Sequence, residues 1–300
     1  MNRIFFIFLF LLLSINGFTQ LLDINKPLFT DDPFFNSSFI KENNIKSITG
    51  SRSSKKIQDI IRANGLDYYY EFNNQGLLTH QIATFFLQNV NKDTNIISYQ
   101  YDEANNLVLR RKSDNYGFFS HQYQFDSLNR IIKQTYNREE NAYSCKKDFE
   151  LCQRYKISSD SFSYQKLSEL QLKKLFYNNY GKTYKHQFYY YDDLGYTIET
   201  RTKYLIGNNK SKTNYKYNEK GWLIQQEDFT SLAGNKKSTT IYEYDSIGNV
   251  LIIHQSENDV AITKKQFLYD KKTMLITAQI IQDIPSGFLQ IIQYHYTFYE

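Results

Sequence analysis

The chain has 300 residues and a formal net charge of +5, and its composition is rich in aromatic side chains, with 27 Tyr and 23 Phe against only 3 Pro. The mild positive charge gives no support to nucleic-acid binding, because such domains usually carry a dense basic patch. Abundant aromatic residues and scarce proline favour β-strands over helices or disorder. We therefore expect a β-rich protein of one large or two small domains that does not bind nucleic acid.

The first residues have the organisation of a secretory signal peptide. Arg3 precedes an apolar run from Ile4 to Ile15, and the small residues Gly17 and Thr19 suit a cleavage site before Gln20. The run is shorter than the roughly 20 residues that a membrane-spanning helix needs. We expect residues 1–19 to be removed, the mature chain to reach the periplasm, the cell surface or the medium, and no transmembrane helix to remain.

Residues 20–65 lack the repeat found in the rest of the chain, and we expect them to form an N-terminal capping segment. Asn36 or Ser37 can begin a short helix that ends at Asn43. The stretch 45–52 is typical of a strand, and residues 55–65 fit either a short helix or a strand. This segment is expected to cover the first edge of a sheet, because open edges invite pairing with other chains.

A short motif recurs between residues 66 and 300: two aromatic residues two positions apart, then Asp or Asn, two further residues, and Gly or Asn. Clear copies begin at Tyr70, Tyr99, Tyr123, Tyr189, Tyr215, Tyr242 and Phe267, with a weaker copy at Leu175. Most copies are 24 to 29 residues apart, whereas the second aromatic positions 177 and 191 are only 14 residues apart. Such self-similarity indicates tandem repeats of one supersecondary unit.

The chemistry of the motif is that of a tight β-hairpin turn. An Asp or Asn side chain can accept a hydrogen bond from a backbone N–H two residues on, and Gly or Asn tolerates the left-handed conformation that the turn needs. This combination predicts a type I turn closed by a glycine bulge. The residues that we assign to these turns are Asn73, Gly76, Asp102, Asn105, Asp126, Asn129, Asn178, Gly181, Asp192, Gly195, Asn218, Gly221, Asp245, Gly248 and Asp270. Thr273 replaces Gly in the last copy, which predicts strain or a different turn there.

This turn also fixes the register of each hairpin, because the second aromatic residue should lie opposite the residue six positions later. The predicted pairs are Phe72–Leu78, Tyr101–Leu107, Phe125–Ile131, Tyr217–Leu223, Tyr244–Val250 and Tyr269–Leu275. Two strands per unit predict an up-and-down meander of roughly 16–18 strands.

The recurring acidic residues could instead be read as a column of metal ligands. Asn takes the same position at Asn73, Asn178 and Asn218, which a turn tolerates and a charge-dependent site would not. The five histidines fall at different offsets of the repeat, and no catalytic or phosphate-binding motif is present. We therefore expect no enzymatic activity, no metal and no cofactor.

An irregular insert at 137–176 interrupts the repeats. It holds the only two cysteines, Cys145 and Cys152, which in an exported protein are candidates for a disulfide across a hairpin tip, with two free thiols as the alternative. Residues 163–176 have leucines near helical spacing and are the best candidate for a short amphipathic helix, although a strand also fits.

The paired tyrosines of the repeat suggest a binding surface, since aromatic faces stack on sugar rings and phenols donate hydrogen bonds. The candidate aromatic binding face consists of Tyr99, Tyr101, Tyr189, Tyr191, Tyr215, Tyr217, Tyr242 and Tyr244. The alternative is that these rows form the core of a thin sheet. The basic stretch 201–220 is expected to be solvated.

The run Y-x-Y-D-x-x-G-x-L resembles the YD repeat of Rhs-type proteins, which include polymorphic toxins and the teneurins. The dipeptide itself is present at Tyr101-Asp102, Tyr191-Asp192, Tyr244-Asp245 and Tyr269-Asp270. With its predicted signal peptide, the chain is also similar to small exported YD-repeat proteins of Bacteroidetes-type bacteria. In the family these repeats build a spiralling β-sheet that can close into a shell, so the resemblance implies an all-β repeat domain over residues 66–300.

We therefore expect an extended, twisted or curved antiparallel meander sheet, with a short helix or two near the N-terminus or in the 137–176 insert. The main functional hypothesis is a non-enzymatic exported scaffold that binds carbohydrate or another envelope protein. Two alternatives remain open: a structural or vestigial component of an Rhs-type toxin or envelope system, and an outer-membrane β-barrel, which alternating strands would permit.

Overall fold

The computed structural model describes residues 21–22, 35–87, 91–114, 117–207, 209–231 and 234–300, and the predicted signal peptide lies outside this part of the chain. These residues form one short helix and 18 strands. In chain order the elements are α2 (Ser37–Glu42), β1 (Ile45–Lys55), β2 (Arg62–Phe72), β3 (Leu78–Leu87), β4 (Asn91–Tyr101), β5 (Leu107–Asp114), β6 (Gly117–Phe125), β7 (Ile131–Asn141), β8 (Leu151–Ser168), β9 (Gln171–Tyr177), β10 (Thr183–Tyr191), β11 (Thr197–Tyr204), β12 (Lys210–Tyr217), β13 (Leu223–Thr230), β14 (Lys236–Tyr244), β15 (Val250–Glu257), β16 (Val260–Tyr269), β17 (Ile276–Asp283) and β18 (Leu289–Phe298).

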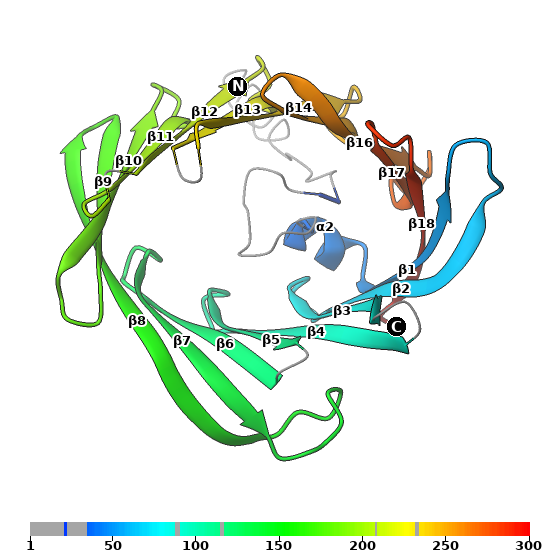
Figure 1. Ribbon diagram of the computed structural model, residues 1–300, viewed down its shortest axis with the longest axis horizontal. Helices are drawn as coiled ribbons and strands as arrows, with labels where there is room; N and C mark the ends of the chain where they lie inside the picture. Colours follow the sequence, from blue (N-terminus) through cyan, green and yellow to red (C-terminus); the bar gives the residue numbers. More distant parts are fainter. Residues whose placement is uncertain (1–20, 23–34, 88–90, 115–116, 208, 232–233) are drawn as a thin grey trace, which may run out of the picture.

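The strands form a single antiparallel sheet that closes on itself as a barrel (Figure 1). Strand β1 pairs with both β2 and β18, so that Ile48 lies opposite Tyr70 on one side and Tyr296 on the other. Closure gives a hydrogen-bonding partner to backbone groups that an open edge would expose.

The expected extended and open meander sheet is therefore wrong, and so is the spiralling sheet that the resemblance to YD repeats implied. The repeat pattern is local: it specifies each hairpin, but it does not encode whether the first and last strands meet. Residues 45–65, which we expected to cap an open edge, instead supply β1 and the start of β2 and complete the wall.

Seven hairpin turns with the repeat chemistry lie at one end of the barrel, which we call end A; the opposite end is end B. In the β4–β5 turn, Asp102 Oδ1 accepts hydrogen bonds from the backbone N–H of Ala104 at 2.9 Å and of Asn106 at 2.8 Å. Asn105 takes the left-handed conformation, with φ of 63°. Each turn is followed by a register shift, and five of the six predicted cross-strand pairs are observed.

The last turn differs from the others by one residue. The left-handed residue is Met274, with φ of 58°, and Asp270 N donates to Leu275 O. Tyr269 therefore lies opposite Ile276, and the predicted partner Leu275 is wrong. The chain accommodates Thr273 by lengthening the turn, because a β-branched residue is costly in the left-handed region.

The short step between the copies at 177 and 191 also has a structural reason. The turn that begins at Asn178 joins β9 to β10 at end B, and the turn that begins at Asp192 joins β10 to β11 at end A. The two motif copies therefore flank a single strand instead of lying at the same end of the barrel.

Of the two helices predicted from the sequence, the one after Asn36 is confirmed and the one at 163–176 is wrong. Asn36 caps α2, because its side chain accepts from the backbone N–H of Ser38 and of Phe39. The helix expected at 163–176 is wrong: these residues belong to β8 and β9, which pair over Ser161–Tyr177. Pairing with the neighbouring strands outweighs the helical spacing of the leucines there.

Candidate functional site

The inner wall at end A is packed with apolar side chains from the N-terminal segment. Viewed along the barrel, α2 lies within the ring of strands (Figure 1). Phe39 and Ile40 of α2 are buried against Tyr70 and Phe72 of the wall, and Leu21 belongs to the same cluster. This end of the barrel therefore has a hydrophobic core that holds the N-terminal segment inside the ring.

All eight tyrosines of the candidate binding face project from the inner wall. Side chains alternate between the two faces of a strand, and paired residues share a face. The register connects Tyr189 to Thr200 and to the rest of the inner row, and Tyr99 and Tyr123 pack in the same cluster as Phe39. The tyrosine rows thus face the lumen, and they do not form a surface on the outside of the barrel.

Three of these tyrosines, Tyr101, Tyr217 and Tyr244, also have a structural role for the hydroxyl group. Near end A, each bulge interrupts the backbone pairing between one hairpin and the next. Between β15 and β16, for example, the last pair on this side is Ile252 with Gln266. In six places a tyrosine hydroxyl bridges this gap by donating to a backbone carbonyl of the preceding hairpin. The bonds run from Tyr101 to Leu78 (2.8 Å), Tyr164 to Ile131 (2.9 Å), Tyr217 to Thr197 (2.9 Å), Tyr244 to Leu223 (2.5 Å), Tyr269 to Val250 (2.9 Å) and Tyr296 to Ile276 (2.8 Å).

The inner wall is more polar toward end B. Thr213 donates to Asp228 at 2.6 Å, and Tyr184 donates to Asp160 at 3.1 Å. Lys174 and Lys185 point to the same side of the wall and lie over aromatic rings, with Lys185 Nζ 3.8 Å from the centre of the Phe176 ring. The lumen is therefore divided into an aromatic half at end A and a polar half at end B.

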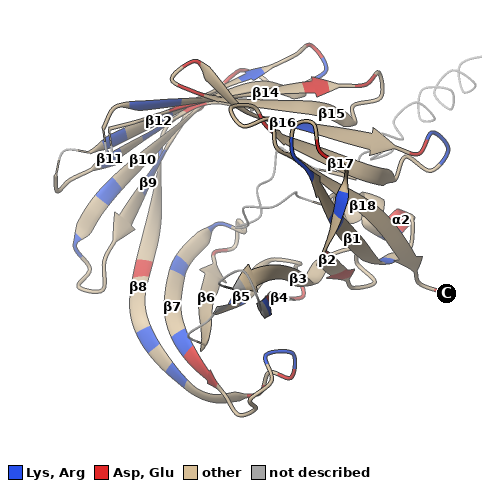
Figure 2. Cartoon of the chain, turned by 45° about the vertical axis from the view of Figure 1, so that its right-hand side comes forward, with Lys and Arg blue, Asp and Glu red and all other residues tan. Residues whose placement is uncertain are grey.

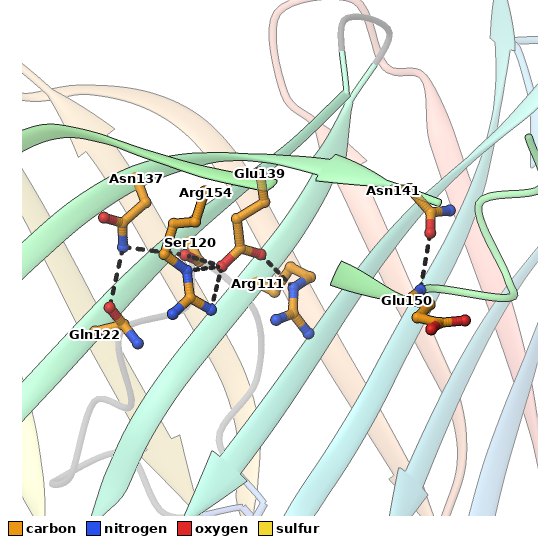
Figure 3. Close-up of polar contacts among 8 residues, drawn as sticks. All are labelled: Arg111, Ser120, Gln122, Asn137, Glu139, Asn141, Glu150 and Arg154. Atoms are coloured by element: carbon orange, nitrogen blue, oxygen red, sulfur yellow. Dashed lines mark hydrogen bonds and ion pairs between the residues drawn. The ribbon is translucent and has the colours of Figure 1, made fainter. Parts of the chain in front are cut away.

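The β7–β8 hairpin curls over the outer wall and is held there by a buried carboxylate (Figure 3). Glu139 is fully buried, and its carboxylate accepts from Arg111 at 2.5 Å, from Ser120 at 2.7 Å and from Arg154 at 2.8 Å. Asn137 continues the network by donating to Ser120 and to a neighbouring glutamine, each at 3.3 Å. Three strands are thereby tied to β8 through one charge.

The tip of this hairpin makes two further contacts, one with β4 and one with β5. Lys146 pairs with Asp93 at 2.8 Å, and the Arg111 guanidinium lies 3.9 Å from the centre of the Phe149 ring. Cys145 and Cys152 are both free and exposed, so the expected disulfide is not formed. Cys145 belongs to the loop that folds onto the wall, whereas Cys152 lies at a register shift in β8.

The turn residues act as parts of the hairpins. The Asp and Asn side chains of the turns accept backbone N–H groups, as they do at Asn218 and Asp245. Within the described ranges, no three His, Cys, Asp or Glu side chains come together as a possible metal site. No helix in the described part of the chain is long and apolar enough to cross a membrane.

Sequence reasoning missed the Glu139 network entirely. Glu139 lies in the irregular insert beside Glu140, and its partners come from three other strands at sequence separations of 15 to 28 residues. No repeat position or motif connects these residues. The one signal in the sequence is the occurrence of Arg and Glu residues close together in the insert, as at Arg138, Glu139 and Glu140.

Among known proteins, the chain is similar only to some solved structures. No family model and no curated protein matches the chain significantly. A porin-like protein from Bacteroides uniformis is 12% identical, with a TM-score of 0.39 over 85% of this chain and 97% of that one. A porin-like protein from Bacteroides vulgatus is 8% identical, with a TM-score of 0.33 over 72% of this chain and 97% of that one. The TcdB2–TccC3 structure is 12% identical, with a TM-score of 0.22 over 72% of this chain and 17% of that one.

Proposed function

We propose that the chain is an exported β-barrel that is inserted in a bacterial outer membrane. The observation that carries this proposal is the closure of 18 antiparallel strands through β1. Closed barrels with an even number of antiparallel strands are the form in which sheets cross membranes, because no backbone group is left unpaired in lipid. A closed barrel supports this alternative better than the open binding scaffold that was the main expectation.

The difference between the two ends supports the same proposal. Outer-membrane barrels have short turns on the periplasmic side and longer extensions on the outer side. End A carries the compact repeat turns, whereas the β1–β2 and β7–β8 hairpins extend from end B beyond the ring (Figure 1). We infer that end B faces outward and that end A, with α2 inside, faces the periplasm.

Fractionation of cells that produce the full chain tests this proposal. We expect the chain in the outer-membrane fraction after washing with high salt and urea, and its release only by detergent. A folded barrel should also migrate faster in gel electrophoresis before heating than after it. Release by osmotic shock together with periplasmic proteins would contradict membrane insertion.

A second candidate is an envelope barrel that is surrounded by water. It is favoured by one observation, the charge on the outer wall, where Arg201, Lys212 and Lys264 project from the strands. Arg or Lys facing lipid costs about 2–4 kcal/mol at the bilayer midplane and about 0–1 kcal/mol near the interfaces. Recovery of folded barrel in the osmotic-shock fraction would decide for this candidate.

A further inference from the structure

We propose that the inner wall of strands β9 and β10 binds the phosphate group of a small solute through Lys174 and Lys185. Lys185, Gln187 and Tyr189 alternate along β10, and Tyr189 belongs to the inner row, so all three face the lumen. Lys174 lies directly opposite Gln187 and shares this face. The two lysines are therefore diagonal neighbours, which lie roughly 7–8 Å apart in a sheet.

Aromatic rings hold the two ammonium groups in place. The Nζ atoms of Lys174 and Lys185 lie 4.9 Å and 3.8 Å from the centre of one ring, that of Phe176. Lys174 Nζ is also 4.1 Å from the ring centre of Phe162, and Lys185 Nζ is 5.7 Å from that of Tyr204. The face of a ring attracts a cation but does not neutralise its charge. The rings therefore position two positive charges beside the lumen.

The charge of this lysine pair is not balanced by the protein. Figure 2 shows that basic residues recur on strands β8 to β12, where acidic residues are sparse. Within the described part of the chain, neither Lys174 nor Lys185 forms an ion pair. Asp160 lies on the same inner face, but its carboxylate accepts from the Tyr184 hydroxyl at 3.1 Å. Each ammonium has three N–H donors, so an anion between the lysines would accept hydrogen bonds and reduce their repulsion.

A solute in the lumen can reach this part of the wall. The hydrophobic cluster around α2 includes residues of β1 to β7 and of β14 to β18, but none of the described residues of β8 to β13. Figure 1 shows α2 on the side of β1 to β3, across the lumen from β9 and β10. Lys174 and Lys185 are both partly exposed. The N-terminal helix therefore leaves the lysine pair accessible.

The kind of cation and the neighbouring donors favour phosphate over carboxylate. Lysine provides a compact point charge that suits a phosphate group, whereas the planar fork of arginine suits the two oxygens of a carboxylate. Gln187 Oε1 accepts from the Tyr189 hydroxyl at 2.9 Å, which leaves the amide N–H groups of Gln187 for another acceptor. Thr202 lies opposite Gln187 and adds a hydroxyl group. Two ammonium groups and these neutral donors can together surround a tetrahedral oxyanion.

Calorimetric titration of inorganic phosphate and of glycerol phosphate into the purified full-length barrel tests this inference. Detergent covers the outer wall and leaves the lumen in contact with water, so we expect saturable binding. Lys174→Met together with Lys185→Met removes both charges and keeps flexible side chains packed on the rings. This variant should weaken binding about tenfold or more. A folded parent barrel that binds neither probe would overturn the proposal.

The matched control is Lys173→Met together with Lys203→Met. It removes the same charge from the opposite, outer face of β9 and β11, where these residues lie opposite Phe188 and His186. Binding should stay within about twofold of the parent, because the charges that contact the ligand remain. Equal losses in the inner and outer variants would overturn the proposal.

Thermal unfolding separates a binding role of the lysines from a structural one. Phosphate should raise the melting temperature of the parent and of the outer control, but not that of the inner variant, because a ligand stabilises only the protein that binds it. Without phosphate, the inner variant should unfold no earlier than the parent, since the repulsion between the lysines is gone. A loss of stability without any loss of phosphate binding would show that the lysines are structural.

Other solutes identify the group that is recognised. Succinate carries two carboxylates and should bind more weakly than phosphate, and glycerol should not bind. Equal binding of succinate and phosphate would overturn the phosphate assignment. Tighter binding of glycerol phosphate than of inorganic phosphate would identify an ester as the ligand, and the reverse would identify free phosphate. The inference requires a closed barrel but no membrane, so its failure is distinguishable from a failure of membrane insertion.

Discussion

The arc of strands β10 to β18 and the long β7–β8 hairpin are held in different ways. In the arc, the same type of hairpin recurs, with one longer turn at Asp270, and tyrosine hydroxyls join successive hairpins. The long hairpin instead depends on one buried carboxylate, Glu139, and its two arginine partners. Loss of one tyrosine bond should be tolerated because the others remain, whereas the loss of Glu139 removes the bonds to Arg111, Ser120 and Arg154 together.

The largest effect is expected for Glu139→Gln. The substitution leaves the buried Arg111 without its ion pair, and breaking a buried pair costs about 3–5 kcal/mol. The free energy of unfolding should fall by this amount in denaturant titration, and protease should cut the hairpin tip at 142–150.

The matched control is Glu257→Gln in the arc, whose pair with Lys236 is about half exposed on both sides, at 46% and 49%. Exposed pairs contribute about 0–1 kcal/mol, so this variant should unfold nearly as the parent does. Equal destabilisation by the two substitutions would show that the hairpin does not depend on Glu139.

The second prediction compares a repeat turn that α2 covers with a repeat turn that is exposed to solvent. A Cβ added at Gly76 would lie 2.0 Å from the backbone oxygen of Ser37 in α2, whereas nothing lies within 4 Å of the same atom at Gly195. Both glycines have positive φ, so each substitution by Ala carries about 1 kcal/mol of backbone strain.

Gly76→Ala should therefore lower the melting temperature clearly more than Gly195→Ala, because it also displaces α2 from the lumen. If thermal unfolding of the two variants is indistinguishable, α2 is not docked against this turn.

A smaller effect is expected for Tyr269→Phe in the arc. Removing the hydroxyl leaves the carbonyl of Val250 without its bond, which costs about 1–3 kcal/mol for a buried group. Tyr180→Phe, at a side chain that is 85% exposed, should have no measurable effect on denaturant unfolding. A null result for Tyr269→Phe would mean that water replaces the bond between hairpins.

The smallest expected effect is on the stability of the repeat turns at low pH. The backbone N–H of Asn106 holds the pKa of Asp102 below its usual 3.8, and the backbone N–H of Thr273 does the same for Asp270. A lowered folded-state pKa contributes stability above pH 3.8 that is lost as the pH falls through the folded value.

Replacing both residues by Asn should make the turns insensitive to pH and shift the midpoint of acid unfolding slightly downward. Circular dichroism between pH 5 and pH 2 measures this shift. An unchanged midpoint would mean that the carboxylates contribute nothing in their charged form.

The hairpins could be predicted from the sequence because their determinants are local. The Asp or Asn cap, the left-handed Gly or Asn and the two aromatic residues lie within nine residues, and they specify pairs such as Phe125–Ile131. The prediction failed at Thr273, where the turn gains a residue to avoid strain.

Closure and the sites on the walls could not be predicted in the same way. Pairs such as Ser47 with Thr297 join residues that are 250 positions apart, and no repeat pattern encodes them. The tyrosines could be recognised as one face of each strand, but only closure decides that this face is the inside.

The closed barrel is the central claim, and a cross-link between β1 and β18 tests it most directly. Ser47 and Thr297 lie opposite each other with their hydroxyl oxygens 2.7 Å apart. Ser47→Cys together with Thr297→Cys, with Cys145 and Cys152 replaced by Ser, should form an intramolecular disulfide in nearly every molecule under mild oxidation. Ser47→Cys with Thr239→Cys, on a distant part of the wall, should not. Peptide mass spectrometry that finds the first pair unlinked, or linked only between chains, would contradict closure.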